Sequence, residues 1–76
     1  MPTIVRFGNL KVQMFADDHN PPHFHLLTPD YEALIKLADF SVIAGRIDGR
    51  SYEIATRWAA NNRELLAHEW ERLNQR

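Results

Sequence analysis

The sequence predicts an α+β fold: a four- or five-stranded, mainly antiparallel sheet followed by one long C-terminal helix packed on one face. Apolar residues alternate with polar ones at residues 10–15 and 32–37, which is the period of half-buried strands, and residues 3–7 are rich in β-forming types. From Ser51 onward apolar residues recur at helical spacing instead. All strands precede the helix, an order typical of antiparallel sheets covered on one side. We therefore expect a single domain, 1–76, with a sheet part, 1–47, and a helix, 48–76.

Short turns connect the expected strands. Gly8-Asn9 predicts a hairpin turn, and Thr28-Pro29-Asp30 is a second turn signal. Pro21 and Pro22 exclude regular structure from the stretch before residue 23, because proline lacks a backbone donor and restricts its predecessor. Gly45 ends or bends the last strand. The predicted strands cover residues 3–7, 10–15, 23–27, 32–37 and 41–47.

One apolar stripe predicts the helix, with Asp48 or Ser51 as its N-cap. Asn61-Asn62 marks a point where it could break, because asparagine is a poor helix former. We expect Trp58 and Trp70 to anchor the core. The stripe consists of Ile54, Ala55, Trp58, Ala59, Leu65, Leu66, Trp70 and Leu73.

Composition narrows the functional classes. The chain has no cysteine, so disulfides and thiolate metal sites are excluded. The chain has nine Lys and Arg residues and ten Asp and Glu residues, so it lacks the excess of basic residues that is typical of duplex-DNA binders. No signal peptide begins the sequence, and no segment approaches the roughly 20 apolar residues that cross a bilayer. We expect a cytoplasmic protein without membrane contact, for which homodimerisation is a plausible extra source of stability.

Three of the four histidines fall within the eight residues from Asp18 to His25. If residues 23–27 form a strand, His23 and His25 share one face, with Cα atoms roughly 6 to 7 Å apart. We expect both imidazoles to be open to water, with Phe24 turned toward the helix. His19 joins the pair only if the proline-containing loop turns back, and Asp18 could then fix its tautomer.

Three hypotheses compete for this cluster. His19, His23 and His25 could bind zinc or nickel as a metal module without turnover. The same histidines, with Asp18, could supply the acid and base that cleave RNA, with Arg46 facing the phosphate. A structural role, in which the imidazoles hydrogen-bond the backbone, is the third.

Two polar residues interrupt the apolar stripe of the helix. Asn62 either marks a kink or projects into a site, and Glu69 either reaches water near the helix end or faces an interface. We place both on the opposite side of the sheet from His23 and His25. A further functional hypothesis is a non-enzymatic interaction protein whose open sheet face, with Tyr31 or Trp70 as anchors, docks a partner protein.

Three stretches together resemble one small prokaryotic family, the domain of unknown function 4160. They are the Met1-Pro2-Thr3-Ile4 opening, the Asp18-His19-x-Pro21-Pro22-His23-Phe24-His25 run and the Trp58-Ala59…Glu64-Leu65-Leu66…Trp70 pattern.

The resemblance implies a function by association. Such proteins are often encoded beside a member of the unknown-function family 2442, in a pair of the toxin–antitoxin kind. The resemblance implies that this chain is one component of such a pair, with the toxin role favoured over the antitoxin role. It would act on RNA or another nucleic acid through the histidines. The chain departs from the family pattern at Asp48, where proline is common, and at Asn62, where histidine is common. The second departure weakens a catalytic set that includes a helix histidine.

Overall fold

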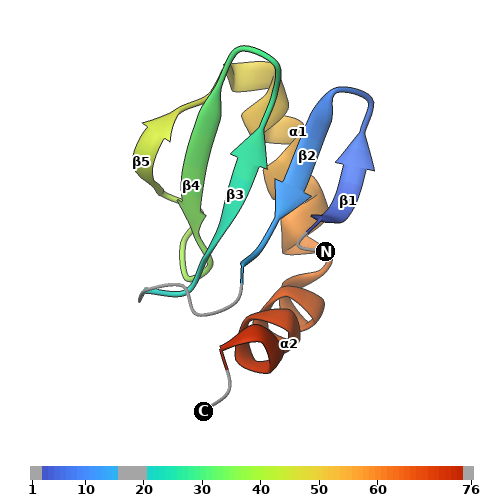
Figure 1. Cartoon of the computed structure of the whole chain (residues 1–76), viewed down its shortest axis with the longest axis vertical. Helices are drawn as coiled ribbons and strands as arrows, with labels where there is room; N and C mark the ends of the chain where they lie inside the picture. Colours follow the sequence, from blue (N-terminus) through green and yellow to red (C-terminus); the bar gives the residue numbers. More distant parts are fainter. Residues whose placement is uncertain (1–2, 16–20, 75–76) are drawn as a thin grey trace.

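The computed structural model describes residues 3–15 and 21–74. It is an α+β structure, as predicted, with five strands in one antiparallel sheet in the order β1-β2-β3-β4-β5. Two helices follow the sheet in the chain (Figure 1). The elements are β1 (Thr3–Phe7), β2 (Leu10–Gln13), β3 (His23–Leu27), β4 (Glu32–Lys36), β5 (Val42–Arg46), α1 (Gly49–Ala60) and α2 (Arg63–Leu73).

The prediction of one long helix is wrong, because the helical segment breaks at Asn61 and Asn62. Both asparagine side chains turn back onto the preceding turn. Asn62 Nδ2 donates to the carbonyl of Trp58 at 2.8 Å, and Asn61 Nδ2 donates to that of Arg57 at 3.2 Å. These bonds compete with continuation of the helix, which is why asparagine favours helix ends. Asn62 therefore marks a kink.

Asp48 caps α1, as predicted. Its carboxylate Oδ2 accepts a hydrogen bond from the backbone N–H of Ser51 at 3.0 Å. That bond satisfies one of the donors that a helix start leaves unpaired.

One face of the sheet and both helices form the core. In Figure 1, α1 lies behind the sheet, and α2 lies beyond the end at which β3 begins. Trp58 is half-buried and packs edge-on against Phe7, with ring centroids 6.4 Å apart, and Trp70 is buried, so both act as the predicted anchors. The buried apolar side chains are Leu10, Val12, Met14, Phe24, Leu26, Ala33, Ile35, Ala55, Ala59, Leu66 and Trp70.

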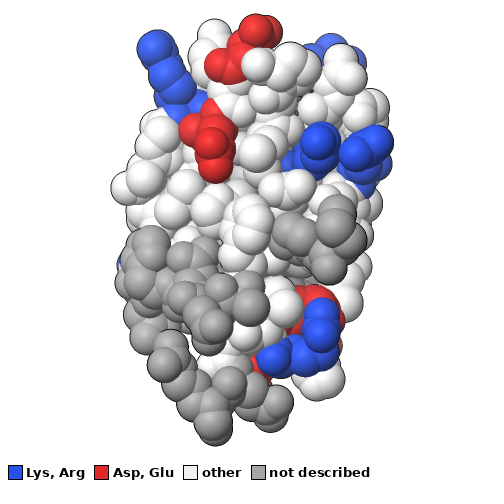
Figure 2. Space-filling view, viewed as in Figure 1, with Lys and Arg blue, Asp and Glu red and all other residues white. Residues whose placement is uncertain are grey.

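The opposite face of the sheet is not covered by either helix. Figure 2 looks onto this face, and uncharged side chains occupy the middle of its described part, with charged ones above and beside them. Among residues 3–15 and 21–74, neither helix has the length and apolar character needed to cross a membrane.

Candidate functional site

β3 carries the histidines on the face that the helices leave uncovered. Phe24 is fully buried beneath the sheet, and alternation along the strand places His23 and His25 on the other side, as predicted. Their ring centroids lie 5.3 Å apart. The two imidazoles are thus neighbours, which any joint role in binding or catalysis needs.

His23 differs from the expectation of an exposed imidazole, because it is completely buried. Its Nδ1 lies 2.8 Å from the carbonyl oxygen of Pro21, which accepts a hydrogen bond when that nitrogen carries the proton. Its ring centroid lies 5.2 Å from that of Trp70. The break at Asn62 explains the difference: α2 lies beyond the end of the sheet, and from there Trp70 reaches His23.

His25 keeps some access to solvent, with 13% of its side chain exposed. Its Nδ1 lies 3.6 Å from Oε2 of Glu32, an ion-pair distance when the ring is protonated. The ring of Phe15 packs edge-on against it at a centroid distance of 4.5 Å. A carboxylate beside an imidazole is the arrangement that orients histidines in many active sites.

Glu32 is a candidate site residue that sequence reasoning missed. It lies on β4, where Leu34 pairs with His25, so Glu32 is diagonal to His25 on the same face. On the neighbouring strand β5, Arg46 lies directly opposite Glu32 in the register of the sheet. The only sequence signal was the Thr28-Pro29-Asp30 turn, which sets the register of β3 and β4 but not the side-chain contact.

Asp18 and His19 lie outside the described residues. Glu69 forms an ion pair on α2 with Arg72, whose Nη2 lies 2.7 Å from Oε1. Within residues 3–15 and 21–74, no three His, Cys, Asp or Glu side chains gather that could hold a metal ion.

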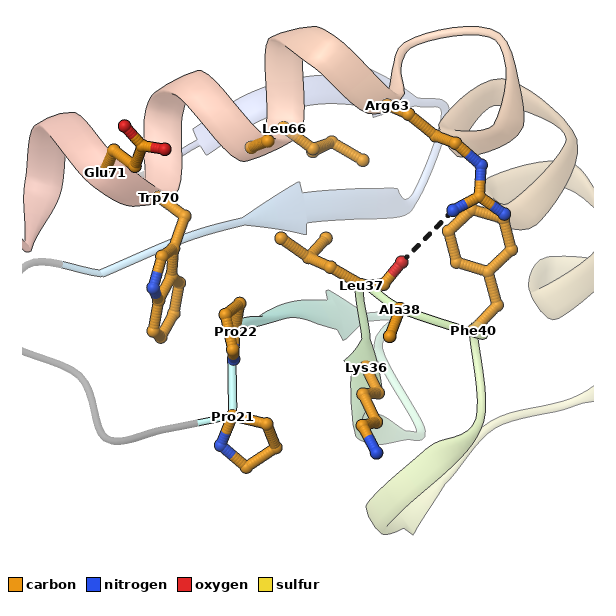
Figure 3. A pocket seen from close by; sticks show the side chains of 11 residues that line it. Pro21, Pro22, Lys36, Leu37, Ala38, Phe40, Arg63, Leu66, Trp70 and Glu71 are labelled. Atoms are coloured by element: carbon orange, nitrogen blue, oxygen red, sulfur yellow. Dashed lines mark hydrogen bonds between the residues drawn. The ribbon is translucent and has the colours of Figure 1, made fainter.

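A cavity of about 460 Å³ adjoins the buried histidine and was not predicted. It lies between α2 on one side and, on the other, Pro21, Pro22 and the segment that joins β4 to β5 (Figure 3). Its walls are mostly apolar. They comprise Pro21, Pro22, Lys36, Leu37, Ala38, Phe40, Arg63, Leu66, Ala67, Trp70 and Glu71. We call this cavity the α2 groove.

His23 holds two walls of the α2 groove in place. Pro21, which accepts its hydrogen bond, and Trp70, which packs against its ring, both line the groove. Pro22 lines it as well, and its carbonyl accepts a backbone hydrogen bond from Leu37 at 3.0 Å. The proline-histidine run therefore helps to build a cavity whose main walls come from distant parts of the chain.

Phe40 forms one end of the groove in a strained conformation. Its φ of 62° lies in the left-handed region, which costs a bulky residue about 1–3 kcal/mol. Its carbonyl accepts a hydrogen bond from the Tyr52 hydroxyl at 2.5 Å, and its backbone N–H donates to the backbone carbonyl of Lys36 at 2.8 Å. The guanidinium of Arg63 lies 4.4 Å from the ring centroid, a cation–π distance.

Charged residues on α2, at the end of β4 and on the segment between β4 and β5 shift one another's pKa values, although only Lys36 among them lines the groove. Hydrogen bonds from Ser41 and, to a smaller extent, the charge of Lys36 lower the pKa of Asp39. A hydrogen bond from Arg72 and its charge lower the pKa of Glu69, and the same pairing raises that of Arg72. Lys36 and Arg72 thus have acidic neighbours.

The chain belongs to the family described as domain of unknown function DUF4160, whose model matches residues 9–71. The matched range contains the whole histidine run, every described strand but β1, and most of α2. No curated protein and no solved structure matches the chain. The family assignment agrees with the resemblance found in the sequence and leaves the function to be argued from the site.

Proposed function

We propose that the protein is the partner-binding component of a two-protein pair, of the toxin–antitoxin kind that the family resemblance implies. In this view it acts by holding a neighbouring gene product, and the α2 groove is its recognition surface. The histidine run serves mainly to shape that surface.

The burial of His23 carries this proposal. A general acid or base must reach the proton it transfers, and a metal-binding imidazole must reach the ion. His23 instead lies inside the protein, against Pro21 and Trp70. Both partners line a mostly apolar concave site, and such sites are where proteins bind ligands.

Co-purification of the product of the neighbouring gene tests the proposal. Expressed together from their native order, the two proteins should elute as one complex through affinity and size-exclusion steps. Substitution His25→Ala, which leaves the groove intact, should leave that complex unchanged. Separate elution of the two proteins would contradict a partner-binding role, and loss of the complex with His25→Ala would move recognition to the open face.

A second candidate function is attack on RNA at the open face of the sheet. His25, with Glu32 at 3.6 Å and Arg46 paired to Glu32, favours it. Here His25 would take the proton from a ribose 2′-hydroxyl while Glu32 stabilises the protonated ring and Arg46 faces the phosphate. The 2′-oxygen would form a bond to the adjacent phosphorus, the bond from phosphorus to the 5′-oxygen would break, and the released 5′-oxygen would take a proton from water. This would be the toxin role in the pair.

Growth inhibition separates this second function from the first. Expression of the chain alone should slow growth, and His25→Ala or Glu32→Gln should relieve that effect, since each breaks the imidazole–carboxylate pair. His68→Ala is the matched control, because His68 is exposed on α2 away from the sheet face. Equal inhibition by all forms would remove His25 from the mechanism.

A further inference from the structure

The two ends of the α2 groove carry opposite charges. Arg63 lies at the end formed by Phe40, and Glu71 lies beside Trp70 at the other end (Figure 3). The two residues are eight positions apart on one helix, which corresponds to about 12 Å along its axis. The groove therefore has a direction that a bound segment would have to match.

The middle of the groove is apolar. Leu37 and Leu66 face it between the two charged ends, and the ring of Trp70 continues this apolar surface at the Glu71 end (Figure 3). Its cavity of about 460 Å³ falls within the usual range for preformed binding pockets. An apolar side chain placed here would be removed from water, which is the main source of affinity in such pockets.

Arg63 is the cation at the Phe40 end of the groove. It makes a hydrogen bond of 3.4 Å to the carbonyl of Leu37, which engages one of the five donors of its guanidinium. No carboxylate lies within 4.0 Å of it among the described residues. Lys36 also lines the groove, and its charge helps to lower the pKa of Asp39, although no carboxylate lies within 4.0 Å of Lys36 among the described residues either.

We infer that the α2 groove takes a short extended segment of the partner protein, with an apolar side chain at its centre, an acidic residue against Arg63 and a basic residue against Glu71. This inference rests on the proposed partner-binding function. About four extended residues span the 12 Å between the charged ends, at roughly 3.3 Å per residue. The acidic and basic residues of the segment are therefore expected three or four positions apart.

Selection from a displayed library of random 12-residue peptides tests the inference on the whole chain. We expect enrichment of peptides with an acidic residue, one or two large apolar residues and then a basic residue, or the reverse order. The Arg63→Glu variant should weaken the selected peptides at least tenfold. The double variant Arg63→Glu with Glu71→Lys should select peptides in which the two charges exchange places.

Two matched variants on α2 control for the location of binding. Ala67 is exposed and lines the groove, so Ala67→Trp should fill it and abolish peptide binding. His68 is exposed on the same helix but does not line the groove, so His68→Trp should leave binding unchanged. Circular dichroism establishes that each variant is folded, and Arg63→Glu remains informative if Ala67→Trp is not.

Three results would overturn the inference. They are a library that yields no peptide, selected peptides that bind the Ala67→Trp variant as well as the parent, and a consensus without charge that ignores Arg63→Glu. If the neighbouring gene product still co-purifies in any of these cases, the partner-binding function stands and its surface lies elsewhere. If that product does not co-purify but the peptides bind as expected, the groove is a peptide site and the two-protein pairing is wrong.

Discussion

At the scale of single residues, His23 shows how a chemically reactive side chain becomes a structural one. Its ring is enclosed, bonded to Pro21 and packed on Trp70. The residue type and spacing predicted chemistry, but the enclosure comes from a tryptophan 47 positions later in the chain. His25, two residues on, keeps partial exposure and the neighbour Glu32, so the same pattern yields two different environments.

Replacement of His23 by alanine should destabilise the fold by about 2–4 kcal/mol. The change removes a buried ring and its hydrogen bond to Pro21, and it leaves a void beside Trp70. Urea unfolding followed by fluorescence measures the loss. His68→Ala, at an exposed position, should stay within about 0.5 kcal/mol of the parent. A similarly small loss of stability for His23→Ala would contradict the role of His23 in holding Pro21 and Trp70 in place.

Gly45 should tolerate no side chain. Its φ is 78°, and a Cβ added there would lie 2.2 Å from the carbonyl oxygen of Glu32. We expect Gly45→Ala to cost about 2–4 kcal/mol, since both the backbone conformation and the close strand pairing would have to change. Gly49→Ala is the control: nothing lies within 4 Å, φ is ordinary, and stability should be unchanged within about 0.5 kcal/mol. Thermal unfolding of both variants separates strain at Gly45 from a general effect of lost glycine.

At the scale of elements, the cap of α1 predicts a pH dependence. Hydrogen bonds from Ser51 lower the pKa of Asp48 below its ordinary value of 3.8. A carboxyl whose pKa falls on folding contributes stability above its unfolded pKa and loses it as the pH falls through the folded value. The contribution of Asp48 is therefore complete at neutral pH, begins to fall near about pH 4 and is lost as the pH falls through the lower pKa of the folded state.

Two substitutions isolate this contribution. Asp48→Ala should lower the midpoint of thermal unfolding by a few degrees at pH 7, because the cap is lost. Asp48→Asn should keep most of the pH 7 stability, since asparagine also caps helices, and should lose less than the parent between pH 5 and pH 3. If the melting midpoints of the parent and of Asp48→Asn fall by the same amount across that pH range, the charge of Asp48 does not contribute to stability.

Elements were the level that the sequence predicted best. Alternation of apolar residues placed β2 and β4, β-forming residues and turn signals placed the other three strands, and Asp48, one of the two predicted caps, begins α1. The continuation of the helix was wrong because one stripe of apolar residues runs through both α1 and α2. Periodicity reports which face is buried, whereas the side-chain hydrogen bonds of Asn61 and Asn62 decide whether the axis continues.

At the scale of the whole molecule, the α2 groove could not be predicted from the sequence. It joins Pro21 and Pro22 with Phe40 and with Trp70, and no local pattern relates these positions. The neighbouring placement of His23 and His25 was accessible, because it needs only the two-residue period of one strand. Contacts between elements, such as Glu32 with His25 and Trp70 with His23, require the register and the bend to be known first.

The sheet and α2 should unfold together, since they share one core. Leu66 of α2 is 1% exposed and belongs to the same buried cluster as Phe24 and Ile35 of the sheet. We expect Leu66→Ala to cost about 2–5 kcal/mol and to shift the fluorescence and far-UV dichroism transitions equally. Leu65→Ala, 44% exposed, is the control and should have little effect. Separate transitions by the two probes would mean that α2 melts on its own.

The positions of the two tryptophans give the molecule an internal optical reporter. Trp58 lies against Phe7, and Trp70 faces the α2 groove. With Trp58→Phe, the remaining indole emission would come from the groove alone. Binding of any peptide or protein could then be followed without a dye. A change in the emission spectrum of Trp70 would indicate that the ligand binds at the groove.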